Sequence, residues 1–261
     1  MKLTRLLIIF VVFVCAVAHA QTYSLGYQKL DRKELYRIIA DSKTTTTQHE
    51  VLISRANTYH LLEFAAEAYY RRLQKQPNNP VLKAAFGWAL FDSMGPDFYY
   101  KPTDRKLRDE LLAKHKDEAL QILDENIGPK GRGRNIAFCW QAAAVPRLLP
   151  WIGPAEKARE YARKSLQLDP KNPRGWRQIA WSYLYTVSSD KAEPAKALAA
   201  GRRVVELNPN LSAGYSYQAK ALFALRRYKE AYQMLLEMNR RVPPQFRDAN
   251  QLARYKRMAS Q

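Results

Sequence analysis

The chain has 261 residues and a formal net charge of +19 at pH 7, from 43 Lys and Arg against 24 Asp and Glu. This length allows a large buried core, as one extended domain or as two compact ones. The positive charge favours anionic partners, although a solvated basic surface is an equal alternative. Two cysteines exclude a disulfide framework, because Cys15 lies in a segment that we expect to be removed, leaving Cys139 alone.

The first twenty residues have the three-part organisation of a secretory signal peptide. A charged start precedes an apolar run over residues 6–18, and a small-x-small sequence ends at Ala20. We expect cleavage between Ala20 and Gln21. A retained membrane anchor is the alternative, but the apolar run is shorter than the roughly 20 residues that a spanning helix needs. The sequence therefore predicts an exported protein, periplasmic or secreted, and export argues against nucleic acid as its partner.

After this segment the hydrophobic pattern is helical almost without interruption. Asp31 can cap a helix that runs to about residue 41, and a polar stretch follows it. We expect residues 21–45 to form an N-terminal capping helix and a linker. Residues 244–261 read as a final helix whose polar side chains suit a C-terminal cap.

Prolines recur between these two ends, each just after a predicted helix that it cannot continue. They are Pro77, Pro170, Pro209 and Pro243. The spacings of 39 and 34 residues between the last three fall in the range of repeating helical units. The pattern predicts a solenoid of helix pairs over residues 46–243.

Residues 173–243 resemble the tetratricopeptide repeat, whose pattern is Trp-x2-Leu-Gly-x2-Tyr, then Ala-x3-Phe, then Pro. The clearest copy reads Trp176, Ile179, Ala180, Tyr183, Ala197, Gly201 and Pro209. The resemblance is looser over 46–170, where Lys83 and Asn135 replace the leading aromatic residue. It implies an all-α fold, a right-handed superhelix of about five helix pairs with capping helices.

A small residue followed by a tryptophan recurs in three predicted first helices. The copies are Gly87-Trp88, Cys139-Trp140 and Ala180-Trp181. The small residue lets the partner helix approach closely, and the tryptophan lies about 100° further round the helix. In tetratricopeptide repeats the corresponding stripe lines the inside of the superhelix, where peptides bind. Carried over, the resemblance implies a partner-binding groove of Trp88, Trp140, Arg174, Arg177, Trp181, Tyr185, Lys220 and Phe223. Packing between successive first helices is the alternative for these aromatics.

Two irregular segments are further candidates for contact with a partner. One is an enlarged connection, Met94–Asp104, whose consecutive aromatics either bind or pin the loop to its own scaffold; they are Phe98, Tyr99 and Tyr100. The other, Gly128–Asn135, is rich in glycine and precedes a helix. Its cations form a possible anion site, or else a flexible basic turn; they are Lys130, Arg132 and Arg134.

The sequence offers little support for catalysis. No HExxH, CxxC or Gly-x-Ser-x-Gly motif is present, so we expect no enzyme, no cofactor and no metal site. The leading hypothesis is an exported tetratricopeptide-like adaptor that holds a peptide or protein in an aromatic and basic groove. The alternative is a binder of an anionic envelope polymer, such as a polysaccharide, phospholipid or cell-wall polymer, through the basic surface. An enzyme stands third.

Overall fold

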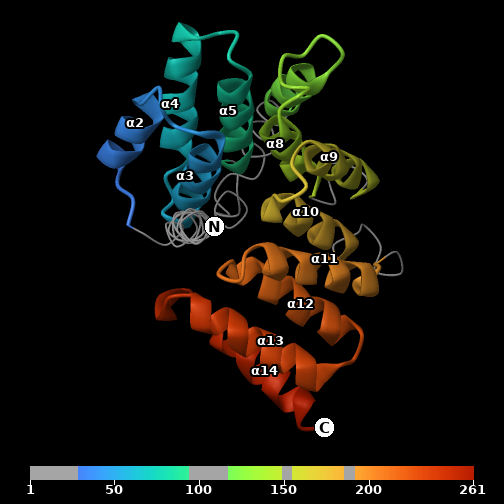
Figure 1. Ribbon diagram of the computed structural model, residues 1–261. Coiled ribbons are helices and arrows are strands. Elements are labelled where there is room, and N and C mark those ends of the chain that lie inside the picture. Colours follow the sequence, from blue (N-terminus) through green and yellow to red (C-terminus); the bar gives the residue numbers. More distant parts are fainter. Residues whose placement is uncertain (1–28, 94–116, 149–154, 185–191) are drawn as a thin grey trace, which may run out of the picture.

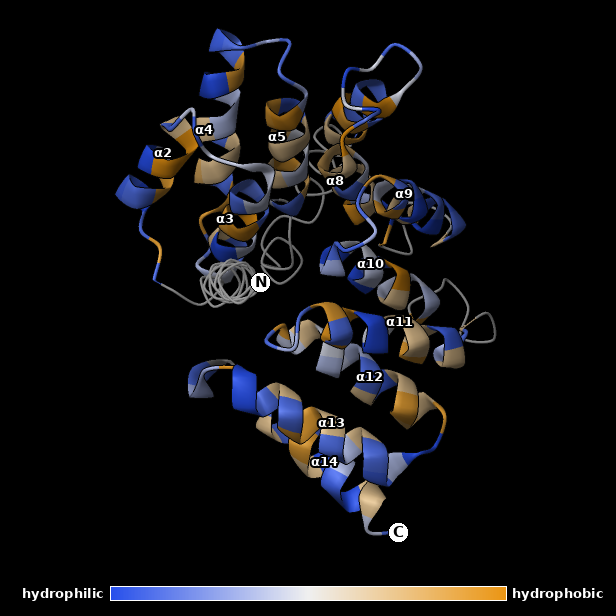
Figure 2. Cartoon of the chain, viewed as in Figure 1, coloured by the Kyte–Doolittle hydropathy of each residue, from blue (hydrophilic) through white to orange (hydrophobic). Residues whose placement is uncertain are grey.

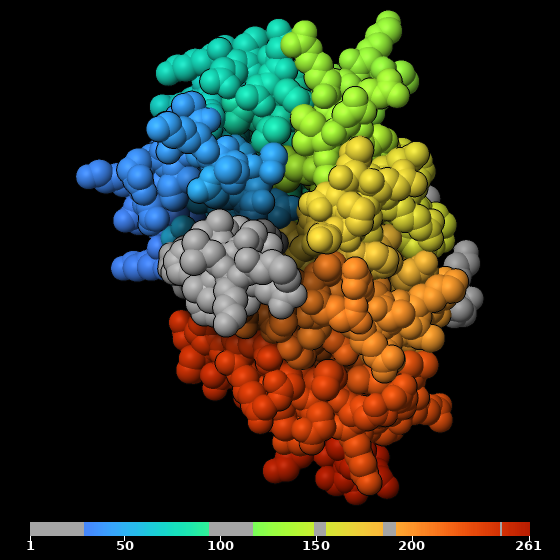
Figure 3. Space-filling view, in the orientation of Figure 1, coloured from blue at the N-terminus to red at the C-terminus, as the bar shows by residue number. Residues whose placement is uncertain are grey.

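The computed structural model describes residues 29–93, 117–148, 155–184 and 192–261. Every regular element in these ranges is a helix, and no strand occurs among them. The helices follow one another along an arc that runs from α2 over the top of the view and down to α14 (Figure 1). In the space-filling view their side chains fill the spaces between successive helices (Figure 3).

Neighbouring helices pack against each other in pairs. An N-terminal helix, α2 (Arg32–Ala40), precedes these pairs. The first helices of the pairs are α3 (Thr46–Thr58), α5 (Pro80–Ser93), α8 (Ala137–Arg147), α10 (Pro173–Leu184) and α12 (Ser212–Ala224). The second helices are α4 (Leu62–Lys75), the helical residues 117–127, α9 (Ala155–Leu168), α11 (Pro194–Leu207) and α13 (Tyr228–Arg241). A short 3₁₀ helix, η3 (Pro244–Phe246), and α14 (Ala249–Ala259) complete the chain.

The predicted N-terminal helix is confirmed, and its cap has a clear physical basis. The Asp31 carboxylate accepts a hydrogen bond from the Glu34 backbone N–H at 2.8 Å. The polar stretch that follows is more ordered than the expected linker. Thr45 and Gln48 form a reciprocal capping box, which satisfies backbone N–H groups at the start of α3.

The prolines mark helix ends as predicted. α4, α9, α11 and α13 each end two residues before a proline, at Lys75, Leu168, Leu207 and Arg241. Proline lacks a backbone N–H and disfavours helical geometry in the residue before it, so the helix stops there. These stops set the length of each second helix and the position of the turn to the next pair.

Small residues in the first helices lie at buried contacts. A Cβ atom added to Gly87 would lie 2.8 Å from the Leu123 side chain of the partner helix, so a larger residue there requires Leu123 to shift. Cys139 and Ala180 are fully buried at the equivalent positions, and burial raises the pKa of the Cys139 thiol to about 12. Cys139 thus acts as a small apolar residue. Each first helix also contacts the next one along the chain, as α8 contacts α10 and α10 contacts α12.

Hydrophobic and hydrophilic residues share the circumference of most helices along the arc (Figure 2), and the buried residues are mostly apolar. α5 carries apolar residues around much of its circumference, because α3, α4 and α8 all pack on it. At the other end, Tyr255 is the buried residue of α14 and stacks on Phe223, with ring centroids 4.4 Å apart. α14 therefore covers the last pair, with Arg254 and Lys256 exposed.

Replacing Gly87 by Leu should destabilise the protein by about 1–3 kcal/mol or more, because the new side chain has to displace Leu123 from a packed interface. The matched control is Ala199→Leu, at an exposed position of α11, which should change the free energy of unfolding by about 0.5 kcal/mol or less. Urea unfolding monitored by circular dichroism measures both. Equal stability of the two variants would contradict close packing at Gly87.

Candidate functional site

Two of the expected groove residues are buried, which differs from the prediction that they line an open surface. Trp88 is 3% exposed, and its indole N–H donates to an Asp92 carboxylate oxygen at 2.7 Å. Its ring packs on Phe138 of α8, with centroids 6.0 Å apart. Trp88 is thus a packing residue between successive first helices, which was the alternative interpretation.

Arg174, 5% exposed, is held by α3. Its Nε atom lies 3.1 Å from a Glu50 carboxylate oxygen, and its Nη1 atom donates to the Ser54 hydroxyl, 120 residues earlier in the chain, at 2.9 Å. This pair joins the first and fourth helix pairs. Burial raises the pKa of Glu50, an effect that the charges of Arg174 and then Arg177 oppose. The predicted groove is therefore occupied at this point by the protein's own ion pair.

The positive charge of Arg177 acts on the pKa of Asp92 as well as on that of Glu50. Burial raises the pKa of Asp92 to about 6, while the hydrogen bond from Trp88 and then the Arg177 charge work in the opposite direction. Glu50 of α3 and Asp92 of α5 are thus both influenced by the positive charge of Arg177 on α10.

Three further groove candidates are partly buried: Trp181, Lys220 and Phe223. Trp181 is half-buried, and its ring lies 6.1 Å from that of Tyr217. The Lys220 ammonium lies 5.9 Å from the same Tyr217 ring, and Phe223 stacks beneath α14. Several other predicted positions lie outside the described residues: Tyr185, Phe98, Tyr99, Tyr100, and the expected cleavage site at Ala20 and Gln21.

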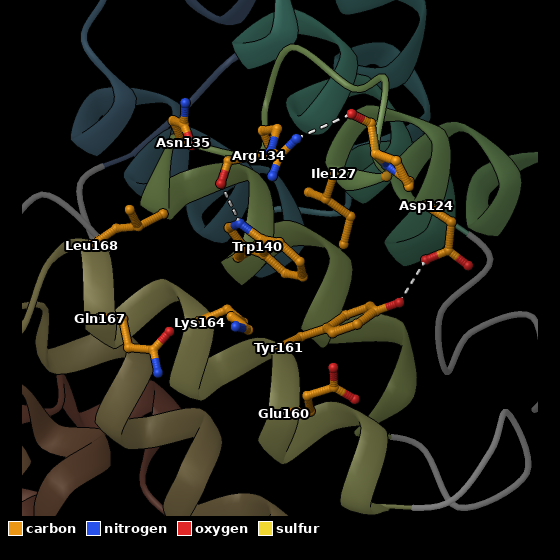
Figure 4. Close-up of a pocket in the computed structure, with 12 residues that line it drawn as sticks. Asp124, Ile127, Arg134, Asn135, Trp140, Glu160, Tyr161, Lys164, Gln167 and Leu168 are labelled. Carbon is orange, nitrogen blue, oxygen red and sulfur yellow. Dashed lines mark hydrogen bonds between the residues drawn. The ribbon is translucent and has the colours of Figure 1, made fainter.

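Trp140 has different surroundings, because it lines a cleft of about 590 Å³ between the start of α8 and α9. In Figure 4 its ring and that of Tyr161 project toward each other from these two helices. The centroids are 5.3 Å apart, in an edge-to-face arrangement. The indole N–H donates to the Arg134 carbonyl at 2.8 Å, which fixes the ring. Leu168, 44% exposed, also lines the cleft.

Tyr161 is anchored by a charged network at the back of the cleft. Its hydroxyl donates to an Asp124 carboxylate oxygen at 3.2 Å, and the other oxygen accepts from Arg147 at 2.5 Å. The Arg147 guanidinium also lies 4.9 Å from the Tyr161 ring. Burial, and next the Asp124 charge, raise the pKa of Tyr161 to about 12. The phenol therefore stays protonated at neutral pH, and it serves as a fixed wall.

The basic loop Gly128–Asn135 forms the rim of the Trp140 cleft and is tightly packed. A Cβ atom on Gly131 would lie 2.2 Å from the Asn126 carbonyl oxygen, and one on Gly133 would lie 2.8 Å from the Cys139 sulfur. Asn126 is itself fixed, since its side-chain amide donates to the Pro80 carbonyl at 2.8 Å. The segment is thus a basic turn whose glycines pack against the rest of the protein. All three predicted cations project from it exposed: Lys130, Arg132 and Arg134.

The structure thus brings together Trp140 and Arg134, which the sequence assigned to two separate sites. It also adds Tyr161, Lys164 and Leu168 from α9. The sequence did not predict these residues, because α9 is the second helix of its pair and second helices were expected only to pack against first helices. An available signal was Leu168, an apolar residue beside the turn at Pro170.

No protein-family model matches the chain, and no curated protein shows significant sequence similarity to it. Within the described ranges, none of the helices is both long enough and apolar enough to cross a membrane.

Removal of the Glu50 charge should destabilise the protein strongly, because Arg174 would keep a buried charge without its ionic partner. We expect Glu50→Gln to lower the free energy of unfolding by about 3–5 kcal/mol. The control is Glu206→Gln, which breaks an exposed pair with Arg203 and should cost about 1 kcal/mol or less. Chemical denaturation compares the two. Similar small costs would show that the Glu50–Arg174 pair does not join the helix pairs.

His49 provides a test of burial by pH. Its Nδ1 atom lies 3.0 Å from the Tyr69 hydroxyl, and burial, then the Arg72 charge, lower its pKa from 6.5 to about 4. The stability from neutral His49 is complete above pH 6.5 and is lost as pH falls toward 4, since the unfolded chain binds the proton first. Between about pH 7.5 and pH 5, the wild type should lose about 2 kcal/mol more stability than His49→Gln. Parallel pH profiles of the two proteins would contradict this.

Proposed function

We propose that this protein is an exported tetratricopeptide-like binding protein that holds a peptide segment of a partner protein in the Trp140 cleft. Its helix pairs stack as a right-handed superhelix that serves as a rigid frame. Support for the frame comes from the ordered pair contacts, the small residues buried in the first helices and the helix ends before prolines. Support for export comes from the sequence of residues 1–20.

One observation carries the binding proposal: a fixed aromatic pair lies in a surface cleft beside an exposed leucine. Trp140 and Tyr161 are both held by hydrogen bonds, so little side-chain freedom is lost when a ligand binds. The cleft volume of about 590 Å³ lies within the range of ligand pockets. Tryptophan and tyrosine are also the residue types enriched at binding hot spots.

The polar side chains of the cleft suit recognition of a peptide. Lys164 and Glu160 lie one helical turn apart on α9, both exposed, and both line the cleft. The Lys164 ammonium and the Glu160 carboxylate can form hydrogen bonds or ion pairs with a bound peptide, on either side of its apolar anchor residue. An apolar anchor on Trp140 with polar contacts around it is the common organisation of a peptide interface.

The placement of the site differs from that implied by the tetratricopeptide resemblance. There the peptide lies along the first helices, a surface that this chain fills in part with Trp88 and the Glu50–Arg174 pair. The Trp140 cleft lies instead where the loop Gly128–Asn135 and α9 meet. We propose this cleft as the main site for the partner.

Selection from a random peptide library tests the proposal and does not require the partner to be identified first. At about 0.5 M salt, where exposed charges are screened, we expect peptides with an aromatic or aliphatic anchor to be enriched on the full chain. Trp140→Ala should weaken the selected peptides at least about tenfold, as expected of a hot-spot residue. Affinity is measured by fluorescence anisotropy.

The control is Tyr70→Ala, which removes an exposed aromatic side chain of α4, outside the cleft. It should bind the peptides like the wild type, and circular dichroism verifies that both variants are folded. If the selected peptides bind Trp140→Ala as tightly as the wild type, the binding site lies elsewhere. Ligands recovered only at low salt, and indifferent to Trp140, would favour the anionic-polymer alternative.

A further inference from the structure

A second cleft, of about 670 Å³, adjoins the Trp140 cleft and shares Asp124, Gly128 and Pro129 with it. Cations from two separate parts of the chain line this cleft. Lys83 comes from α5, while Lys130 and Arg132 come from the basic loop. The sequence had assigned the loop residues to a possible anion site, but it gave no reason to add Lys83, which lies near the start of a different helix pair.

The cations of this cleft are available to a ligand. None of Lys83, Lys130 and Arg132 has a carboxylate within ion-pair distance among the residues that the structure describes, whereas many arginines elsewhere are paired. Two acids also line the wall; Asp124 is in an ion pair, whereas Glu125 is exposed and bonded to a neutral glutamine. Asp124 binds Arg147 and Tyr161, and a Glu125 carboxylate oxygen accepts a hydrogen bond from Gln121 at 2.8 Å.

The backbone that carries Lys130 and Arg132 is preorganised. Gly131 and Gly133 pack so closely on Asn126 and Cys139 that no side chain fits at either position. Asn126 in turn bonds the Pro80 carbonyl, three residues before Lys83. The loop is thus fixed against the same turn of α5 that supplies the third cation. A site held in this way does not have to be assembled when the ligand binds.

We propose that this second cleft binds a multiply charged oxyanion of the phosphate class. Three cations from two directions exceed what a single carboxylate can neutralise. A phosphate-type group offers more than one negative charge and several acceptor oxygens, which suits a combination of lysine ammonium groups and an arginine fork. The group belongs either to a soluble phosphate compound or to the phosphate of a lipid headgroup.

The test uses the full chain and two probes. Inorganic tripolyphosphate is titrated by isothermal calorimetry at low salt, and sedimentation measures binding to vesicles with and without phosphatidylglycerol. The test variant carries Lys83→Gln, Lys130→Gln and Arg132→Gln. The matched control carries Lys33→Gln, Lys43→Gln and Lys171→Gln, which remove the same charge from exposed positions outside both clefts.

The test variant should bind at least one of the two probes at least about tenfold more weakly than the wild type, while the control stays within about twofold. Tripolyphosphate binding without vesicle binding identifies a soluble ligand. Vesicle binding that depends on phosphatidylglycerol and on the three cations identifies a headgroup. Equal losses in the test and control variants would overturn the proposal, because they would reflect net charge alone. So would the absence of binding to both probes.

Discussion

Close contact between paired helices at a small residue is the constraint on which the rest of this structure depends. A helix pair cannot bury its apolar faces alone, so it must pack on its neighbours. This packing requires the two helices of each pair to lie close together. Gly87 shows the limit of the constraint, because even a methyl group there would collide with Leu123. Cys139 and Ala180 meet the same requirement with slightly larger side chains.

The clefts follow from the way in which two neighbouring pairs are joined. The connection from residues 117–127 to α8 packs closely on Asn126 and Cys139 through its glycines. It therefore forms a fixed rim. Trp140 and Tyr161 line the cleft beside one part of this rim, and Lys83 lines the second cleft together with Lys130 and Arg132. The connection between these two helix pairs thus contributes to both clefts.

Much of the fold could be predicted from local sequence, because the signals were local. Asp31 caps its helix through atoms three residues away, and each proline stops the helix just before it. The exposure of the tryptophans could not be predicted in the same way. Trp88 and Trp140 follow equivalent small residues, yet Phe138 of the next first helix packs on Trp88, while Trp140 meets Tyr161 and the loop.

The Glu50–Arg174 pair was likewise beyond sequence reasoning. Its members belong to the first and fourth helix pairs, and their contact depends on the summed geometry of every pair between them. The same holds for Lys83, whose position in the same cleft as Lys130 depends on the fold of the basic loop. Long-range contacts of this kind decide which basic residues are neutralised internally and which have no acidic partner among the described residues.

The most direct test of the central claim is site-specific photocrosslinking in the native host. A photoreactive amino acid is placed at Leu168, which lines the Trp140 cleft, and in a separate protein at Tyr70, which is exposed on α4. We expect a discrete crosslinked partner protein from position 168 and none from position 70. The same partner from both positions, or from position 70 alone, would contradict the assignment of the Trp140 cleft as the binding site.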